Sequence, residues 1–458
     1  MRLRPHIPRL AAALTAAVAL LAGDTIGGGT ALAADYVPGV VIVGYSSQPA
    51  QQITAAIAMR MGARAVGPPP AAHEQLLRLA PGQSVIGAIA RLRREPGVAF
   101  AVPDFIAHAA GPWYPNDRGS SHRARGWEAM QWNFLPAAGV NAPGAWGNLL
   151  ADHRPGGRGV VVAVLDTGVA YRDWHQFRKS PDFGGTRFVA PYDFIEGNRF
   201  PLDRNGHGTV VAGVVAEATN NGFGLTGLAY GAAVMPVRVL DDAGDGDEVT
   251  IARGIRYAVA HGAQVINLSL EFSPDEVTSG AAIPDIVNAI SFAHTRGVVV
   301  VASAGNDRTN ELAYPARAPA VISVGATTRD RCLAQYSNGG AGLDLVAPGG
   351  GPDAYMPGDH DCHPNRSLPP VYQLTLLDPQ LHPDEFGYPG IYIGTSMSSP
   401  EVAAAAALVI ASRVLGPHPT PDQILQRLEQ TAEPLGDTIP NESYGYGLLD
   451  AAAATARP

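Results

Sequence analysis

The chain has 458 residues, of which 46% are hydrophobic and 16% charged, and its formal net charge is −9 at pH 7. This balance is typical of a well-buried globular enzyme rather than a disordered protein, and the acidic charge disfavours nucleic-acid binding, which needs a basic surface. Its two cysteines, Cys332 and Cys362, would form one disulfide in an exported protein or remain free thiols.

The first 34 residues have the pattern of a secretory signal peptide. Arginines precede the apolar run 10–22, and small residues lead to Ala33 and Ala34. The run is shorter than the roughly 20 residues that a membrane-spanning helix needs, which favours cleavage over a membrane anchor. We therefore expect a secreted, extracellular protein with no membrane span in its mature form.

Residues 35–110 predict a small α+β domain. Apolar patterning predicts strands and helices in the order strand, helix, strand, helix, strand, at residues 40–44, 50–61, 74–79, 84–95 and 98–106. Two strand-helix-strand halves are typical of a ferredoxin-like unit, which carries no catalytic set of its own. The Gly-, Pro- and Arg-rich residues 111–129 predict a linker.

Residues 130–458 predict a larger α/β domain. Continuous apolar runs, typical of strands buried on both faces, lie at residues 160–165, 234–240, 265–270, 298–302 and 321–324. Helical stretches lie at residues 208–218, 248–261 and 284–296, and an Ala-rich run continues to residue 415. Alternating strands and helices predict a parallel sheet with helices on both faces.

Four polar residues lie at strand ends and helix starts, where functional residues are usually found in such a sheet. Asp166 follows the first strand and could orient a histidine or cap a turn. His207 begins a glycine-flanked helix and could be a general base or a surface histidine. Asn306 follows the fourth strand and could be an oxyanion donor or a turn residue. Ser396 lies in the turn 394–400 and could be a nucleophile or a capping serine.

Together these motifs resemble those of the subtilisin-like serine proteases (subtilases, peptidase S8). The motifs Asp166–Gly168, Asn205–Gly213, Ala304–Asn306 and Gly394–Pro400 occur once each, and aspartate, histidine and serine follow in the order known for subtilisin. The resemblance covers roughly residues 130–452. It implies a three-layer fold with a mainly parallel central sheet.

The resemblance further implies a secreted serine endopeptidase that is made as a self-processing zymogen. Asp166 would hold His207 in the right tautomer, and His207 would take the proton of Ser396 as this serine attacks the peptide carbonyl. Asn306 and the backbone N–H of Ser396 would bind the oxyanion, as their counterparts do in subtilisin. This chemistry requires no cofactor.

A substrate cleft is also implied by the resemblance. Two segments would pair with an extended peptide: Gly244, Asp245 and Gly246, and Ser269, Leu270 and Glu271. Small residues would line the main specificity pocket and leave room for a sizeable apolar side chain, at Ala302, Ser303, Ala304, Ala313 and Tyr314. Glu271 replaces the usual glycine, and it would narrow the pocket mouth or favour basic side chains.

A structural calcium site is implied at one loop. Asn221, Phe223 and Leu225 resemble the family's calcium loop, in which backbone carbonyls and an asparagine supply hard oxygen ligands. Asp173 lies near the place of the carboxylate that usually completes the site, but it is offset. A tight Asn/Gly turn is the alternative.

The remaining expectations concern partners and departures from the family. Residues 35–110 resemble the family's inhibitor-like prodomain, whose tail at residues 106–115 would occupy the cleft and be cut by the enzyme itself. We expect the protein to be a monomer. Val210 and Glu401 replace common histidines, and a negative Glu401 would suit a first helical turn. Residues 349–390 are an insertion that we interpret as a solvated loop. The competing class is a catalytically silent protein that binds extended peptides.

Overall fold

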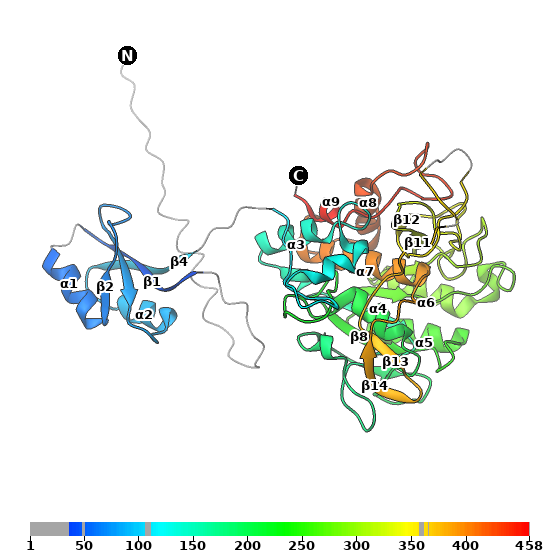
Figure 1. Cartoon of the computed structure of the whole chain (residues 1–458), viewed down its shortest axis with the longest axis horizontal. Coiled ribbons are helices and arrows are strands. Elements are labelled where there is room, and N and C mark those ends of the chain that lie inside the picture. The colour runs from blue at the N-terminus through cyan, green and yellow to red at the C-terminus, as the bar shows by residue number, and fades with distance from the viewer. Residues whose placement is uncertain (1–35, 48–50, 106–110, 357–360, 365, 458) are drawn as a thin grey trace, which may run out of the picture. The chain divides into compact units, whose positions relative to one another are not determined.

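The computed structural model describes residues 36–47, 51–105, 111–356, 361–364 and 366–457. The chain divides into two compact units, residues 1–109 and 110–458 (Figure 1). The predicted signal peptide and the tail residues 106–110 lie outside the described residues. No helix in the described ranges is long and apolar enough to cross a membrane.

The N-terminal unit is an antiparallel four-stranded sheet packed against two helices. The strand order is β2-β3-β1-β4, and the elements in chain order are β1 Tyr36–Tyr45, α1 Gln51–Arg60, β2 Ala63–Ala65, β3 Glu74–Leu79, α2 Val85–Leu92 and β4 Val98–Phe105. The alternation of β1 buries Val41 and Val43 against Leu77 and Leu92. All the elements predicted here are present; the three-residue β2 was not predicted because it is too short for a periodic signal.

The larger unit is built on an eight-stranded parallel sheet. Its order is β12-β11-β10-β9-β5-β8-β6, with β7 also paired to β8. The strands are β5 Val161–Asp166, β6 Arg187–Phe188, β7 Tyr192–Asp193, β8 Ala233–Arg238, β9 Val265–Leu268, β10 Val299–Ser303, β11 Ile322–Thr327 and β12 Leu345–Pro348. The apolar runs therefore predicted the central strands, while the two-residue β6 and β7 gave no signal.

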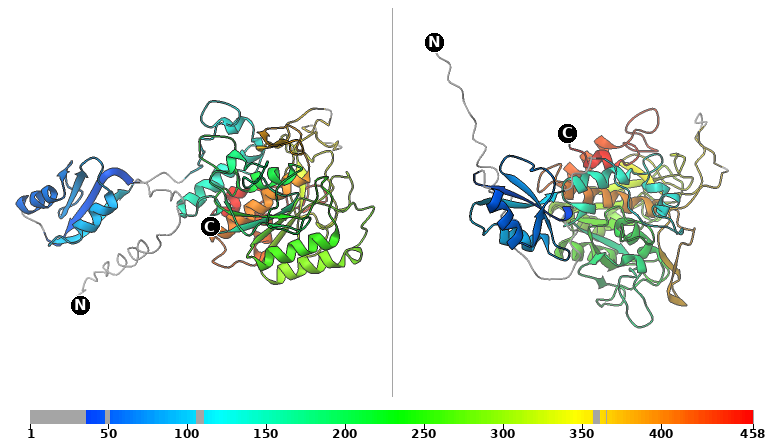
Figure 2. Two further views of the ribbon diagram at one scale, coloured as in Figure 1. Left: turned by 90° about the horizontal axis from the view of Figure 1, so that it is seen from below. Right: turned by 60° about the vertical axis from the view of Figure 1, so that its left-hand side comes forward.

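Helices cover both faces of this sheet. In chain order they are α3 Ala142–Ala151, α4 His207–Ala216, α5 Glu248–Ala260, α6 Pro284–Thr295, α7 Thr395–Ser412, α8 Pro421–Thr431 and α9 Ala451–Thr455. Successive side chains of β5 point to opposite faces: Val162 and Val164 join the core beneath α4 and α7, and Ala163 and Leu165 join the core beneath α5 and α6. Figure 2 shows α5 and α6 side by side in green.

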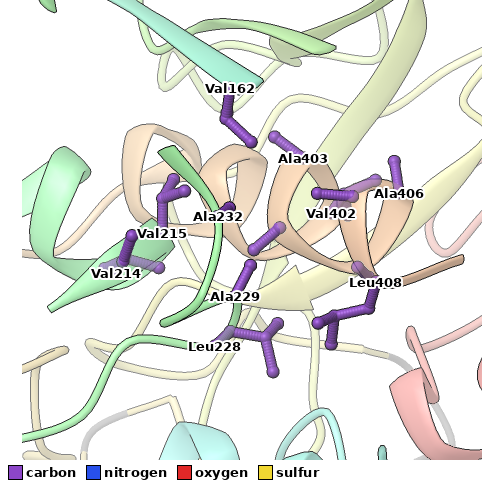
Figure 3. Packing of buried hydrophobic residues seen from close by; sticks show 14 of the residues in the cluster. Val162, Val214, Val215, Leu228, Ala229, Ala232, Val402, Ala403, Ala406 and Leu408 are labelled. Atoms are coloured by element: carbon purple, nitrogen blue, oxygen red, sulfur yellow. The ribbon is translucent and has the colours of Figure 1, made fainter. Parts of the chain in front are cut away.

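Helix α7 is buried along almost its whole length, which explains its Ala-rich sequence. Figure 3 shows Val402, Ala403 and Ala406 of this helix among the side chains of α4 and β5, including Val215 and Val162. Small side chains let the helix lie close to its neighbours, and a well-packed core of this kind tolerates few changes of volume. The helix that begins at the candidate nucleophile is therefore held rigidly.

The insertion at residues 349–390 is not the solvated loop that we expected. It contains an antiparallel hairpin, β13 Thr375–Asp378 and β14 His382–Gly387, and Thr375 Oγ1 donates to the carbonyl oxygen of Gly206 at 2.9 Å. Cys332 and Cys362 form a disulfide with their Cα atoms 5.8 Å apart, which links the insertion to the body. The insertion therefore contacts the residue that precedes His207.

Candidate active site

Asp166 and His207 meet at the carboxyl end of the central sheet. Asp166 ends β5 and His207 begins α4. A hydrogen bond of 2.8 Å joins His207 Nδ1 to Asp166 Oδ1, with the His207 side chain 24% exposed and that of Asp166 1%. Although removal from water opposes the charged imidazole, the Asp166 carboxylate raises the pKa of His207 above its ordinary value.

Asp203 holds the turn that leads into His207, and the sequence analysis did not single it out. Its Oδ1 accepts hydrogen bonds from Thr167 Oγ1 and from the backbone N–H of Gly206, both at 2.9 Å. Its Oδ2 accepts from the Thr209 hydroxyl at 2.6 Å. The buried carboxylate thereby ties the end of β5 to the start of α4. An aspartate four residues before the histidine was the available signal.

Ser396 lies at the start of α7, beside the segment that follows β9. Ser396 Oγ donates to the carbonyl oxygen of Ser269 at 3.4 Å, and Ser269 Oγ donates to the carbonyl oxygen of Ser396 at 2.8 Å. Because β9 and β5 are neighbouring strands, these contacts bring Ser396 to the sheet edge that carries Asp166 and His207. Ser396 and His207 themselves share no hydrogen bond in this structure.

Asn306 lies between the start of α7 and Glu271. Its Oδ1 accepts from the backbone N–H of Thr395 at 2.9 Å and from the Thr395 hydroxyl at 3.1 Å. Its Nδ2 donates to Glu271 Oε1 at 3.3 Å. Since Oδ1 is held by the residue that precedes Ser396, the amide group is fixed beside the candidate nucleophile, where an oxyanion donor is needed.

The predicted walls of the specificity pocket are brought together by hydrogen bonds. Ser303 Oγ donates to the carbonyl oxygen of Leu270 at 3.1 Å. The backbone N–H of Ala313 donates to the carbonyl oxygen of Ala304 at 2.8 Å. The backbone N–H of Phe272 donates to the carbonyl oxygen of Tyr314 at 2.6 Å. Ala302 is buried within β10. Segments 269–272, 302–306 and 313–314 thus form one continuous structure around Asn306.

The segment at residues 244–246, which we expect to pair with an extended peptide, is a loop in this structure. Asp241 N–H donates to the carbonyl oxygen of Asp245 at 2.8 Å, so the chain turns back on itself, and Gly244 has a φ of 94°. Asp245 and Gly246 line a hollow of about 440 Å³ with Phe194 and Asp247. Segment 269–271 likewise continues β9 without strand pairing.

The loop with Asn221, Phe223 and Leu225 is tied to two carboxylates that the sequence analysis missed. Asp117 accepts hydrogen bonds from the backbone N–H groups of Asn220 and Asn221 at 2.7 and 2.9 Å. Asp182 accepts from the Asn221 side chain at 2.8 Å and from the Leu225 N–H at 2.7 Å.

The carboxylates beside this loop are therefore Asp117 and Asp182, and not Asp173, which accepts from the N–H of Lys179 in its own exposed loop. Burial, assisted by the neighbouring Asp117, raises the pKa of Asp182 to about 7, against two hydrogen bonds that lower it. In the described ranges, no three His, Cys, Asp or Glu side chains are grouped to hold a metal ion.

The expectation for Glu401 was wrong, and Val210 is buried in α4. Because α7 begins at Thr395, Glu401 lies beyond the first turn, and its side chain is fully buried. Burial raises its pKa well above the ordinary value, although a hydrogen bond from Asn133 Nδ2 at 2.7 Å opposes this. Glu401 is therefore a buried carboxyl group held by Asn133, not a charge in the first turn of the helix.

The parallel sheet, the aspartate-histidine pair and the serine at a buried helix start define a subtilisin-like serine endopeptidase. Residues 157–447 match the model of the subtilase family, and the chain belongs to that family. Residues 29–104 match the fervidolysin N-terminal prodomain. The protein is accordingly a serine endopeptidase with an N-terminal prodomain.

Several characterised proteins are similar over most of the chain. The thermophilic serine proteinase of Bacillus sp. (strain AK1) is 32% identical over 410 residues, which are 90% of this chain and 86% of that protein. Subtilisin Savinase of Lederbergia lenta is 37% identical over 299 residues, 65% of this chain and 91% of that protein. A protease structure from Pseudoalteromonas arctica is 32% identical with a TM-score of 0.59, covering 75% of this chain and 98% of that one.

Proposed function

We propose that this protein is a secreted serine endopeptidase that uses Asp166, His207 and Ser396 as its catalytic triad. The observation that carries the proposal is the 2.8 Å bond between His207 and Asp166, at the sheet edge where Ser396 begins α7. A buried carboxylate, a half-buried imidazole and a serine hydroxyl at a helix start are the groups that acyl transfer requires.

The resting geometry assigns a role to each side chain. Asp166 Oδ1 accepts a hydrogen bond from Nδ1–H of His207, which leaves Nε2 free to take the proton of Ser396. The Ser396 hydroxyl now donates to Ser269 through a long bond of 3.4 Å. Catalytic hydrogen bonds are often long before substrate binds, so we infer that an occupied cleft turns the hydroxyl toward His207.

The reaction then follows in two steps. Ser396 Oγ attacks the peptide carbonyl carbon, its proton passes to His207, and the carbonyl oxygen becomes an oxyanion that Asn306 Nδ2 and the N–H of Ser396 bind. His207 gives its proton to the leaving amine as the peptide bond breaks. Water, deprotonated by His207, attacks the acyl carbonyl carbon; the ester bond to Ser396 Oγ breaks, and His207 returns the proton to Oγ as the acid leaves.

Digestion of an unfolded protein tests this function against the peptide-binding alternative. Purified mature protein is expected to degrade casein. A mature, folded protein that binds casein-derived peptides without cutting them would overturn the proposal and favour the silent binding protein. Folding is checked by circular dichroism on the same preparation.

The pH dependence of kcat/KM reports the ionisation of His207. The imidazole must be neutral to accept the Ser396 proton, and its pKa in the folded protein is raised by Asp166. Activity is therefore expected to be lost as the pH falls through a pKa above the ordinary value of about 6.5, by tenfold per pH unit. A profile with a small peptide substrate measures this; an acid limb well below pH 6 would contradict the assignment.

We also propose that the precursor is secreted and processes itself. Residues 1–34 would be the signal peptide, 35–110 the inhibitory prodomain, 111–129 the linker and 130–458 the catalytic domain. The prodomain match supports an intramolecular inhibitor. Slow folding of a non-local parallel sheet gives such a domain a physical task as a folding assistant.

The loop at Asn221 is proposed to hold a structural calcium ion. The donor set fits a hard cation: Asp117 and Asp182 would supply carboxylates, Asn221 a side-chain oxygen, and Phe223 and Leu225 backbone carbonyls. Asp117 and Asp182 are both buried beside this loop, and a bound cation would offset the repulsion between the two carboxylates. The ion would stabilise the fold and take no part in the chemistry.

Calcium removal is expected to lower the Tm of the mature protein. Binding to the folded state alone contributes about 2.7 kcal/mol at a concentration 100 times the Kd, which corresponds to roughly 4 °C for a domain of about 330 residues. Calorimetry with calcium and with EGTA measures the shift. Asp182→Asn should abolish it and Asp173→Asn should not; equal Tm values in the two buffers would sink the calcium site.

A further inference from the structure

Glu271 lies next to the groups that would handle the reacting carbonyl. It comes two residues after Ser269, whose carbonyl oxygen accepts the hydrogen bond of Ser396. Its carboxylate accepts two hydrogen bonds from Asn306, Oε2 from the backbone N–H at 2.9 Å and Oε1 from Nδ2 at 3.3 Å. One carboxylate is thus in direct contact with the proposed oxyanion donor.

This position must also be close to a substrate side chain. If Asn306 binds the oxygen of the attacked carbonyl, the side chain of the same substrate residue is attached one bond from the carbonyl carbon and lies within a few ångströms. A Cβ added at Gly305 would lie 2.8 Å from Glu271 Oε2 and 2.9 Å from Ala313 Cβ. The carboxylate therefore lies beside Gly305 and close to Ala313, one of the predicted walls of the specificity pocket.

The charge of Glu271 has no cationic partner in the described part of the chain. None of the ion pairs between described residues involves it. Partial burial, together with the neighbouring Asp307, raises the pKa of Glu271, although the hydrogen bonds from Asn306 oppose this. Glu271 thus presents an exposed carboxylate that accepts hydrogen bonds from Asn306 and has no cationic partner among the described residues.

We propose that Glu271 is a specificity-determining residue that selects lysine or arginine as the acyl-donor residue, the one whose carbonyl is attacked. A cationic side chain would reach the carboxylate and supply the missing charge partner. An apolar side chain in the same space would cover the carboxylate without supplying a charge partner. The enzyme would therefore disfavour substrates with an apolar side chain at this position. The inference rests on the proposed function, because it uses Asn306 as the oxyanion donor.

Matched fluorogenic peptides test the proposal on the mature enzyme. They differ only at the acyl-donor residue, with arginine, lysine, norleucine or phenylalanine; norleucine resembles lysine in length without its charge. The wild type is expected to favour arginine and lysine over norleucine by about 10²-fold in kcat/KM, mainly through KM. A wild type that favours norleucine or phenylalanine would overturn the proposal.

Substitutions at Glu271 separate charge from shape. Glu271→Gln keeps the size and an acceptor for Asn306, and it should reduce the preference to about threefold or less by slowing cleavage after arginine and lysine. Glu271→Asp should retain a preference for the cationic peptides. An unchanged preference in Glu271→Gln would contradict the assignment, even if its overall activity changed.

Two further measurements keep the result interpretable. Titration with a fluorophosphonate counts functional active sites: failure to titrate would sink the proposed function itself, whereas a titratable enzyme without the cationic preference sinks this inference alone. If Glu271→Gln does not fold, benzamidine is compared with benzyl alcohol as inhibitors of the wild type. Stronger competitive inhibition by the cation is expected, and equal inhibition would overturn the proposal.

Discussion

Replacement of Ser396 by alanine is expected to lower kcat on casein by about 10⁶-fold, the loss known for removal of the nucleophile of subtilisin. The reason is that the variant lacks the hydroxyl group that would form the proposed acyl intermediate. The same variant should also accumulate as a precursor with its prodomain attached. Turnover is measured per folded molecule, and maturation by intact mass.

Ser398 provides a matched control on the same helix. Its hydroxyl is fully buried and forms no hydrogen bond with any described residue, so Ser398→Ala removes little from the fold. This variant should mature and digest casein like the wild type. If Ser396→Ala matured normally while Ser398→Ala did not, the assignment of the nucleophile would be wrong.

Replacement of Asp166 by asparagine is expected to lower kcat by about 10⁴-fold near neutral pH. An amide in this place can donate a hydrogen bond to Nδ1 of His207, which favours the tautomer with the proton on Nε2. Nε2 then cannot accept the proton of Ser396. Steady-state kinetics with a peptide substrate measure the loss. The exposed Asp173→Asn is the control, and a decrease of less than about tenfold in Asp166→Asn would contradict the role of Asp166.

The sequence predicted the central sheet because its strands are buried on both faces. Runs such as residues 160–165 have no polar interruption, and β5 indeed lies in the middle of the sheet. β12 was missed because its four residues include a proline, and the hairpin β13–β14 because the Pro-, Asp- and His-rich insertion shows no strand period. Short elements fold here through contacts with distant residues, such as Thr375 with Gly206.

The candidate site was predicted where local motifs mark it. Asp166, His207 and Asn306 each follow a strand or begin a helix, which the sequence displays directly. Asp117 and Asp182 were missed because they approach the loop at Asn221 from positions that are 104 and 39 residues away from it. The contact of Glu271 with Asn306, across 35 residues, could not be read from the chain either.

The most direct test of Ser396 as the nucleophile is to find, by mass spectrometry of peptides from the mature protein, the residue that a fluorophosphonate labels. We expect one adduct per molecule, on Ser396, and no adduct in a His207→Ala variant, because the Ser396 hydroxyl then has no base. An adduct on Ser398, Ser399 or any other residue, or casein digestion that persists without an adduct, would contradict the central claim.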